Sequence, residues 1–267
     1  MKDIEIRNHS WRWAIGIAAL TIAGIVGLNL WPRTEEAPAP KPQAAAPTPT
    51  SAPSAEPVIE HPLPPPANNT PALPALADSD TLAQQALAGL LGNNRLHEWF
   101  HTDQLIRRIV VTVDNLPRAK LTQRQSPFKP IAGSLAVTQN ADALALDAAN
   151  AQRYTPFVQL FSKLDMRQVA TLYRQFYPLF QSAYVELGYP KGYFNDRLVA
   201  VIDHLLATPE PTAPLALTQP KVLYEFADPE LEARSAGQKT LLRMGVTHTR
   251  QVKAKLRELR AQLTAKT

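Results

Sequence analysis

The sequence predicts a mainly α-helical protein: a multi-helix globular domain with one small β-hairpin, preceded by a single transmembrane helix and a disordered Pro-rich linker. Three observations predict this organisation. Residues 13–31 form an apolar stretch long enough to span a bilayer, residues 32–77 are rich in Pro and Ala, and residues 78–267 carry apolar side chains mostly at helical spacing. The chain contains no Cys, which excludes disulfides and lipid attachment through a thiol.

The membrane anchor is predicted from the stretch WRWAIGIAALTIAGIVGLNLW, residues 11–31, in which residues 14–30 carry no charge. At about 1.5 Å per residue, such a helix covers roughly 25–30 Å, the hydrocarbon thickness of a bilayer. Tryptophans stand at both ends, where indole rings prefer the headgroup level. A cleaved signal peptide is the alternative, but the apolar run ends in Leu-Trp-Pro-Arg with no small-residue cleavage site close behind. We therefore interpret residues 13–31 as an uncleaved anchor in the lipid bilayer.

The orientation of this anchor follows from the distribution of Lys and Arg. Three such cations crowd residues 1–12, whereas only Arg33 and Lys41 follow the anchor before the folded region. The positive-inside rule therefore predicts that residues 1–12 are cytoplasmic and that the C-terminal domain is translocated. In a Gram-negative cell this means a single-pass protein of the inner (plasma) membrane with a periplasmic domain.

Small residues recur at four-residue spacing along the predicted anchor, at Ala19, Ala23 and Gly27. This spacing lets two membrane helices approach closely, so a homodimer is one interpretation. Ala and Gly are common in membrane helices in general, and we favour that simpler explanation.

The linker over residues 32–77 holds more than half of the 25 prolines of the chain. Proline fixes φ and removes a backbone donor, so neither a helix nor a sheet persists there. The composition is typical of a polyproline-II-like spacer, about 140 Å long if extended and about 40 Å if coil-like. We expect a tether that lifts the domain off the membrane. A ligand for an aromatic proline-binding groove is the alternative, which we disfavour outside a signalling context.

The first elements of the domain over residues 78–267 are predicted from capping residues and apolar spacing. A helix follows the cap at residues 78–80 and ends at Gly92, and a second helix begins at Asp103. The run VVTV within that second helix also suits a strand, because β-branched residues favour sheets. Leu and Val alternate on both sides of Asn140, which predicts a short β-hairpin.

The later elements are predicted to be helices. Apolar spacing favours helices over residues 149–163, 167–187 and 194–207, short helices near residues 229–243, and a last helix from Thr247 to Leu263. Pro178 interrupts the second of these helices, and we expect it to kink or restart that helix.

The C-terminal region is strongly basic. After Ala233 a single acid, Glu258, faces nine cations: Arg234, Lys239, Arg243, Arg250, Lys253, Lys255, Arg257, Arg260 and Lys266. The last helix also carries an apolar stripe: Val252, Leu256, Leu259 and Leu263. We expect this stripe to dock the helix and leave a solvated basic face. The alternative is contact with a polyanion such as anionic lipid or cell-wall polymer. The chain shows no groove-reading element, so we expect no nucleic-acid partner.

The most specific catalytic pattern is His97-Glu98-Trp99-Phe100-His101, a literal H-E-x-x-H. On one helix face, His97 and His101 could bind zinc while Glu98 activates water. We disfavour this interpretation because no third zinc ligand follows at a suitable spacing and because the segment lies between predicted helices. We therefore assign no metal, no cofactor and no catalytic residue, and we lean against an enzyme.

An aromatic stripe and a pair of carboxylates have simpler explanations than a binding site. The stripe contains Tyr173, Tyr177, Phe180 and Tyr184, with Phe176 nearby. We expect it to be core, with hydroxyls reaching the edge, rather than a platform that stacks on sugars. Asp196 and Asp203 lie two helical turns apart, and a cap at Asn195 together with surface ion pairs explains them better than a paired-carboxylate site.

Three long strings resemble a known family. They are LIRRIVVTVDNLPRAK (105–120), GYFNDRLVAVIDHLLATP (192–209) and PKVLYEFADPELEARSAGQKTLLRMG (220–245). With the anchor and the Pro-rich spacer, they resemble the uncharacterised proteobacterial family called domain of unknown function 3014. The resemblance implies a membrane-associated bacterial protein, and it implies neither an activity nor any catalytic residue.

Three hypotheses of function follow from the sequence. The leading one is a membrane-anchored periplasmic protein that presents a helical interaction domain to another envelope protein or to a cell-wall component. The first alternative is a zinc-dependent periplasmic hydrolase that uses His97, Glu98 and His101. The second is a polyanion-binding protein that acts through the basic C-terminal helix.

Overall fold

Helices build most of the computed structural model, which describes residues 58–64, 72–121, 123–131, 133–140 and 143–265. The predicted helical class is confirmed. The predicted anchor lies outside the described residues. Among the helices of the described part, none is long and apolar enough to cross a membrane.

The elements follow one another in this order. The helices are η1 (Leu76–Asp78), α2 (Asp80–Leu91), α3 (Asn93–Trp99), α4 (Leu105–Asn115), η2 (Gln123–Gln125), α5 (Ala149–Ser162), α6 (Met166–Glu186), α7 (Phe194–Leu206), α8 (Pro229–Glu232), α9 (Ala236–Arg243) and α10 (Val246–Thr264). The strands are β1 (Val137–Asn140), β2 (Ala143–Leu146), β3 (Ala216–Thr218) and β4 (Glu225–Phe226).

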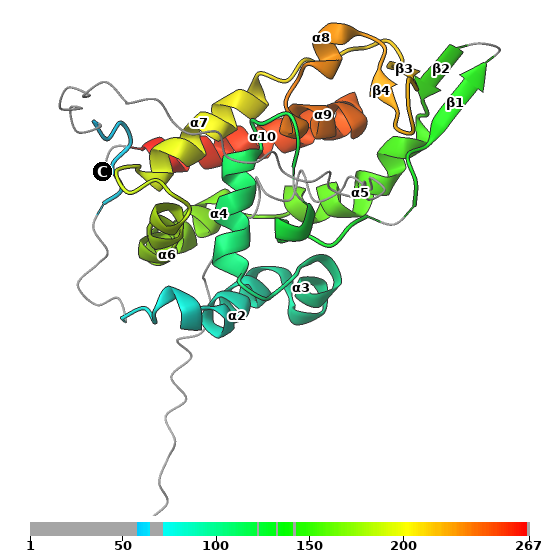
Figure 1. The fold of residues 1–267 in the computed structure, drawn as a ribbon. Coiled ribbons are helices and arrows are strands. Elements are labelled where there is room, and N and C mark those ends of the chain that lie inside the picture. Colours follow the sequence, from blue (N-terminus) through cyan, green and yellow to red (C-terminus); the bar gives the residue numbers. More distant parts are fainter. Residues whose placement is uncertain (1–57, 65–71, 122, 132, 141–142, 266–267) are drawn as a thin grey trace, which may run out of the picture.

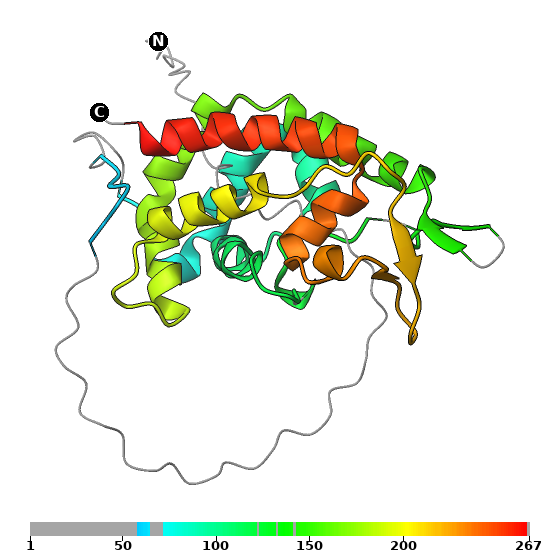
Figure 2. The same cartoon turned by 90° about the horizontal axis from the view of Figure 1, so that it is seen from above.

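The longest helices form one core. Helix α10 packs against α5, α6 and α7, and α4 packs against α6 and α7; Figure 2 shows α10, in red, along the whole helical body. The predicted apolar stripe docks α10, since Val252, Leu256 and Leu259 are fully buried. The VVTV run is helical within α4 because Ile109, Val110 and Val113 all face this core.

Two helices differ from the sequence-based expectation. Helix α3 was not predicted, because its seven residues bury only Leu96 and therefore carry no clear apolar period. Helix α6 continues through Pro178 without a restart. The residues around that proline, among them Phe176 and Leu179, are buried on the core side, and tertiary packing holds the helix together across the missing backbone donor.

The sheet is antiparallel and, in the part of the chain that the structure describes, four-stranded with the order β1-β2-β3-β4. The predicted hairpin is confirmed as β1 and β2, with Val137 paired to Leu146. Strands β3 and β4 were not predicted, because strands of three and two residues are too short to show alternation. The sheet covers a second, smaller apolar cluster around Leu217, Phe226 and Leu242, at the end of the molecule away from the start of α7 (Figure 1).

Part of the predicted linker lies on the folded body. Residues 58–64, blue in Figure 1, run beside the loop between α6 and α7 in both cartoon views. Leu63 and Leu73 are half-buried and pack against the main core. Helix η1 spans the predicted boundary at residue 77. Since Leu63 already packs against the core, the chain contacts the domain well before that position.

Candidate peptide-docking site

The first turn of α7 holds an extended segment of the same chain. The carboxylate of Asp196 accepts a hydrogen bond from the backbone N–H of Glu60 at its Oδ2 (3.0 Å) and one from the N–H of His61 at its Oδ1 (2.7 Å). Two consecutive amides thus share one carboxylate. Hydrogen bonds to a charged acceptor are stronger than those between neutral groups, so this clamp is the strongest polar contact of the segment.

Two neighbouring residues complete the main-chain contacts. Asn195 donates from its Nδ2 to the carbonyl of His61 at 2.8 Å, and the hydroxyl of Tyr193 accepts from the N–H of Leu63 at 2.9 Å. We name Tyr193, Asn195 and Asp196 the docking site. All four hydrogen bonds reach backbone atoms of the bound segment, so they recognise an extended chain rather than particular side chains.

The loop before α7 is fixed by one amide and one glycine. Gln181 donates to the carbonyl of Gly192 (2.7 Å) and accepts from the N–H of Phe194 (2.9 Å). A Cβ at Gly192 would lie 2.7 Å from a ring carbon of Tyr184, so a larger residue would displace this loop. The ring of Tyr193 packs on Tyr177, with centroids 5.3 Å apart. The docking site therefore rests on a rigid aromatic base.

A buried ion-pair network fixes the start of α7 to the end of α4. Asp114, whose side chain is 2% exposed, accepts from Arg197 Nε at 3.0 Å and from Arg118 Nη2 at 2.7 Å. Arg197 also donates to the backbone carbonyl of Asp114 at 2.7 Å. Arg197 directly follows Asp196, so this network sets the position from which the carboxylate clamps the segment.

The predicted aromatic core is confirmed beneath the docking site, but the hydroxyl of Tyr173 is buried rather than at the edge. Tyr173, Phe176, Phe180 and Tyr184 are buried, and Tyr177 is half-buried against them. Burial disfavours a phenolate and raises the pKa of Tyr184 to about 12 and that of Tyr173 well above its ordinary value. The stripe is therefore a packing surface, with the Tyr177 hydroxyl at its edge donating to Gln181 at 2.8 Å.

The two predicted carboxylates have different roles. Asp203 forms a surface ion pair, as expected, with both oxygens bound by Arg260. Asp196 was also expected in a surface ion pair, but among the described residues it instead accepts from the backbone N–H groups of Glu60 and His61. The expected cap at Asn195 is wrong, because the N-cap of α7 is Tyr193 and Asn195 lies inside the first turn.

The H-E-x-x-H segment does not have the helical geometry that zinc binding needs. Helix α3 ends at Trp99, and Phe100 is extended and pairs with Phe128. His97 and His101 are therefore not one turn apart on a helix. His101 has a lowered pKa because of burial and of the nearby Arg108. Within the described ranges, no group of three or more His, Cys, Asp or Glu side chains could hold a metal ion.

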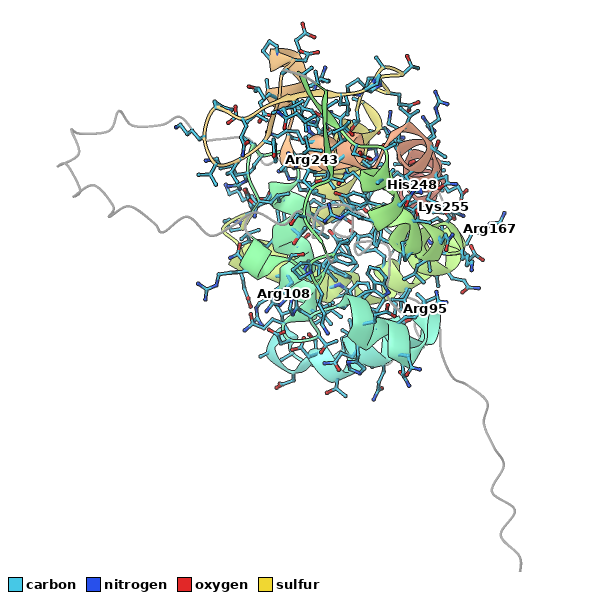
Figure 3. All side chains as sticks on the ribbon, turned by 90° about the vertical axis from the view of Figure 1, so that its right-hand side faces the viewer. Arg95, Arg108, Arg167, Arg243, His248 and Lys255 are labelled. Atoms are coloured by element: carbon cyan, nitrogen blue, oxygen red, sulfur yellow. The ribbon has the colours of Figure 1, made fainter. Side chains whose placement is uncertain are left out.

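The basic side chains of the C-terminal region are mostly paired. Glu210 binds both Arg250 (2.9 Å) and Lys253 (2.8 Å), and these hydrogen bonds lower the pKa of Glu210 to about 2. Lys255 pairs with Glu258 at 2.9 Å. Figure 3 labels two cations of this region, Arg243 and Lys255. This pairing does not favour a polyanion-binding surface.

A cavity of about 450 Å³ lies at the opposite end, between β2, the loop over residues 209–215 and the junction of α9 with α10. Its carboxylates already have partners: Glu210 binds two cations, and Asp147 accepts from Thr138 and from the N–H of Ala149. The remaining lining is largely apolar. The cavity therefore offers little specific chemistry, and the docking site is the stronger candidate.

Comparison with known proteins bears on the family alone. A family model described as "Protein of unknown function (DUF3014)" matches residues 105–260. The chain belongs to this family. No curated protein and no solved structure matches the chain.

The match divides the docking contact into two parts. The docking site and its Asp114 support lie inside the DUF3014 region, whereas the bound segment over residues 58–64 precedes that region. Sequence reasoning missed this contact, because hydrogen bonds between a side chain and a distant backbone leave no periodic signal. The sequence-level pointer was Asp196 itself, a first-turn carboxylate that we had interpreted as part of a surface ion pair.

Proposed function

We propose that this DUF3014 protein is a non-enzymatic binding protein of the bacterial cell envelope. Residues 13–31 anchor it in the inner membrane, the Pro-rich linker carries the helical domain on the periplasmic side, and the docking site binds an extended segment of another envelope protein. The observation that carries the proposal is the clamp of Asp196 on two consecutive backbone amides.

The nature of the contacts supports a protein partner. Main-chain recognition with one apolar anchor is how domains bind extended peptides, whereas sugar or phosphate ligands need convergent hydroxyl, amide or cationic groups. The hydrolase alternative is disfavoured because His97 and His101 do not lie one turn apart on a helix. The polyanion alternative is disfavoured because the C-terminal cations are mostly paired with carboxylates. Binding is therefore the function that the geometry supports best.

The location is tested by reporter fusions placed after Thr267, one reporter active only in the periplasm and the other only in the cytoplasm. We expect activity of the periplasmic reporter. Activity of the cytoplasmic reporter would overturn the proposed orientation and direct attention to inner-leaflet partners.

The binding role is tested by photo-crosslinking in cells. A photoreactive residue replaces Lys191, which is exposed in the loop before α7, and a matched probe replaces Lys221, which is exposed between β3 and β4. We expect a specific adduct with an envelope protein at position 191, lost with Asp196→Ala, and none at position 221. An adduct at position 191 that is indifferent to Asp196→Ala would contradict a role for the docking site.

A further inference from the structure

We infer that the docking site is a receptor for a segment of the form X-X-Pro-Leu in a different polypeptide, and that residues 58–64 are a built-in competitor for it. This inference rests on the proposed function and specifies the chemistry of the partner. Its evidence is the segment Glu60-His61-Pro62-Leu63, which occupies the site in cis.

The first two positions of the form must carry backbone N–H groups. Both oxygens of Asp196 are filled by the amides of residues 60 and 61, and a proline at either position would leave one oxygen without its donor. The side chain of Glu60 is exposed. Many residue types are therefore compatible with position 60, and Pro is excluded from both positions.

The third position suits proline. No group of the docking site accepts a hydrogen bond at position 62, so the missing N–H of Pro62 leaves nothing unpaired. Proline also fixes φ near the polyproline II value, which reduces the conformational entropy that an extended ligand loses on binding.

The fourth position carries the apolar anchor. The N–H of Leu63 donates to Tyr193, and its side chain packs against the main core. The preceding apolar residues do not share this role, because Val58 is 85% exposed and Ile59 is 49% exposed. One half-buried side chain next to a proline thus provides the side-chain specificity of the segment.

The cis segment is an exchangeable occupant. It is held by four main-chain hydrogen bonds and one half-buried leucine, and it leaves the buried Oδ1 of Asn195 without a donor among the described residues. The segment belongs to the same chain as the docking site, and a short connection gives an effective concentration of about millimolar. A segment in trans must therefore compete with a weak but always available ligand.

The test uses the full chain in detergent micelles and a fluorescein-labelled peptide that spans residues 56–66. In the vacated variant, a Gly-Ser sequence of equal length replaces residues 58–64. By fluorescence anisotropy, we expect the peptide to bind the vacated variant at least about tenfold more tightly than the intact chain, because the cis competitor is absent. A peptide with Leu63→Asp should lose binding by about tenfold or more.

Two substitutions in the vacated variant separate the docking site from the rest of α7. Asp196→Ala should abolish peptide binding, whereas Asp203→Ala, two turns along the same helix and paired with Arg260, should leave it unchanged. Equal binding to intact and vacated chains, or loss in both substitutions alike, would overturn the inference. A dimer of the intact chain that needs residues 58–64 would overturn it too, since the occupant would then be a second copy.

A measurement on the intact chain keeps the inference testable if the vacated variant does not fold. Amide exchange at Glu60 and His61 should accelerate severalfold when unlabelled peptide is added in excess, because the cis segment is displaced. No change at saturating peptide would contradict competition. If peptide binding fails while the adduct at position 191 persists, the X-X-Pro-Leu specificity falls and the proposed function stands; if the adduct is also absent, both fall.

Discussion

Asp80 and Asp196 hold two consecutive backbone amides each, yet the segments that they hold have different fates. Asp80 accepts from the N–H groups of Gln104 (2.7 Å) and Leu105 (2.9 Å). Asp196 accepts from Glu60 (3.0 Å) and His61 (2.7 Å). The same carboxylate geometry therefore occurs once at the start of a core helix and once on an extended segment.

The difference lies in what the held segment does next. After Leu105 the chain enters α4, whose apolar face is fully buried, and Gln104 takes a left-handed conformation (φ 49°) to begin that helix. Within residues 58–64, Leu63 is the apolar side chain that packs against the core. The carboxylate of Asp80 is thus structural, because the helix that follows its bound amides is buried. The carboxylate of Asp196 is suited to an exchangeable segment, because the residues after its bound amides bury little apolar surface.

The largest expected effect on stability comes from Asp114, which joins the end of α4 to the start of α7. Asp114→Ala removes the buried acceptor of Arg118 and Arg197, and we expect a loss of about 2–3 kcal/mol in the free energy of unfolding, because the two partly exposed arginines can regain water. Urea denaturation measures this loss. Because Arg197 fixes the start of α7, residues 60 and 61 should also lose amide protection; preserved protection would show that the docking site does not depend on this network.

Removing the structural clamp should have the next largest effect. We expect Asp80→Ala to lower the free energy of unfolding by about 1–2 kcal/mol, because the first amides of α4 lose a charged acceptor. The control is Asp203→Ala, an acid in a surface pair, with an expected loss of under about 1 kcal/mol. Equal losses in the two variants would refute the structural role of Asp80.

Removing the docking clamp should change little in the global stability. For Asp196→Ala we expect a loss of about 1 kcal/mol or less, since the released segment buries one side chain, together with fast amide exchange at residues 60 and 61. Asp80→Ala should not accelerate those amides at matched stability. A large loss in the free energy of unfolding with Asp196→Ala would show that the two carboxylates have the same structural role.

The smallest expected effect is the loss of stability at alkaline pH when Tyr184, next to the docking site, ionises. The pKa of Tyr184 is raised to about 12 because burial disfavours the phenolate, and its ring stacks on Tyr189 at 4.5 Å between centroids. A raised folded-state pKa contributes stability that is fully present below the unfolded value of about 10 and is lost as pH rises through about 12. Phenolate absorbance should show a late-titrating tyrosine that Tyr184→Phe removes.

Much of the helical fold could be predicted from the sequence, because long helices carry their burial pattern in their own residues. Examples are α10, whose stripe of Val252, Leu256 and Leu259 is buried as expected, and the hairpin around Asn140. The missed elements, α3, β3 and β4, are short, and β3 pairs with a strand about 70 positions earlier in the chain, which no local pattern shows.

The candidate site could be predicted much less well. Its partners Glu60 and Asp196 are 136 positions apart, and the held atoms belong to the backbone, which every residue carries. The composition of residues 32–77 predicted a stretch with little to bury, yet one leucine and four main-chain hydrogen bonds place residues 58–64 on the domain. The alternative that this stretch is a ligand for an aromatic proline-binding groove was disfavoured outside a signalling context, and it stays a hypothesis.

Main-chain recognition also affects how the bound segment tolerates mutation. Val58, Ile59 and Glu60 are exposed, so most substitutions there would be neutral for docking, and only a proline at position 60 or 61 would remove a donor that Asp196 needs. The segment is therefore free to drift in sequence while its docking persists. In related sequences we therefore expect conservation of an apolar residue at position 63 and an absence of proline at positions 60 and 61, rather than a conserved sequence motif.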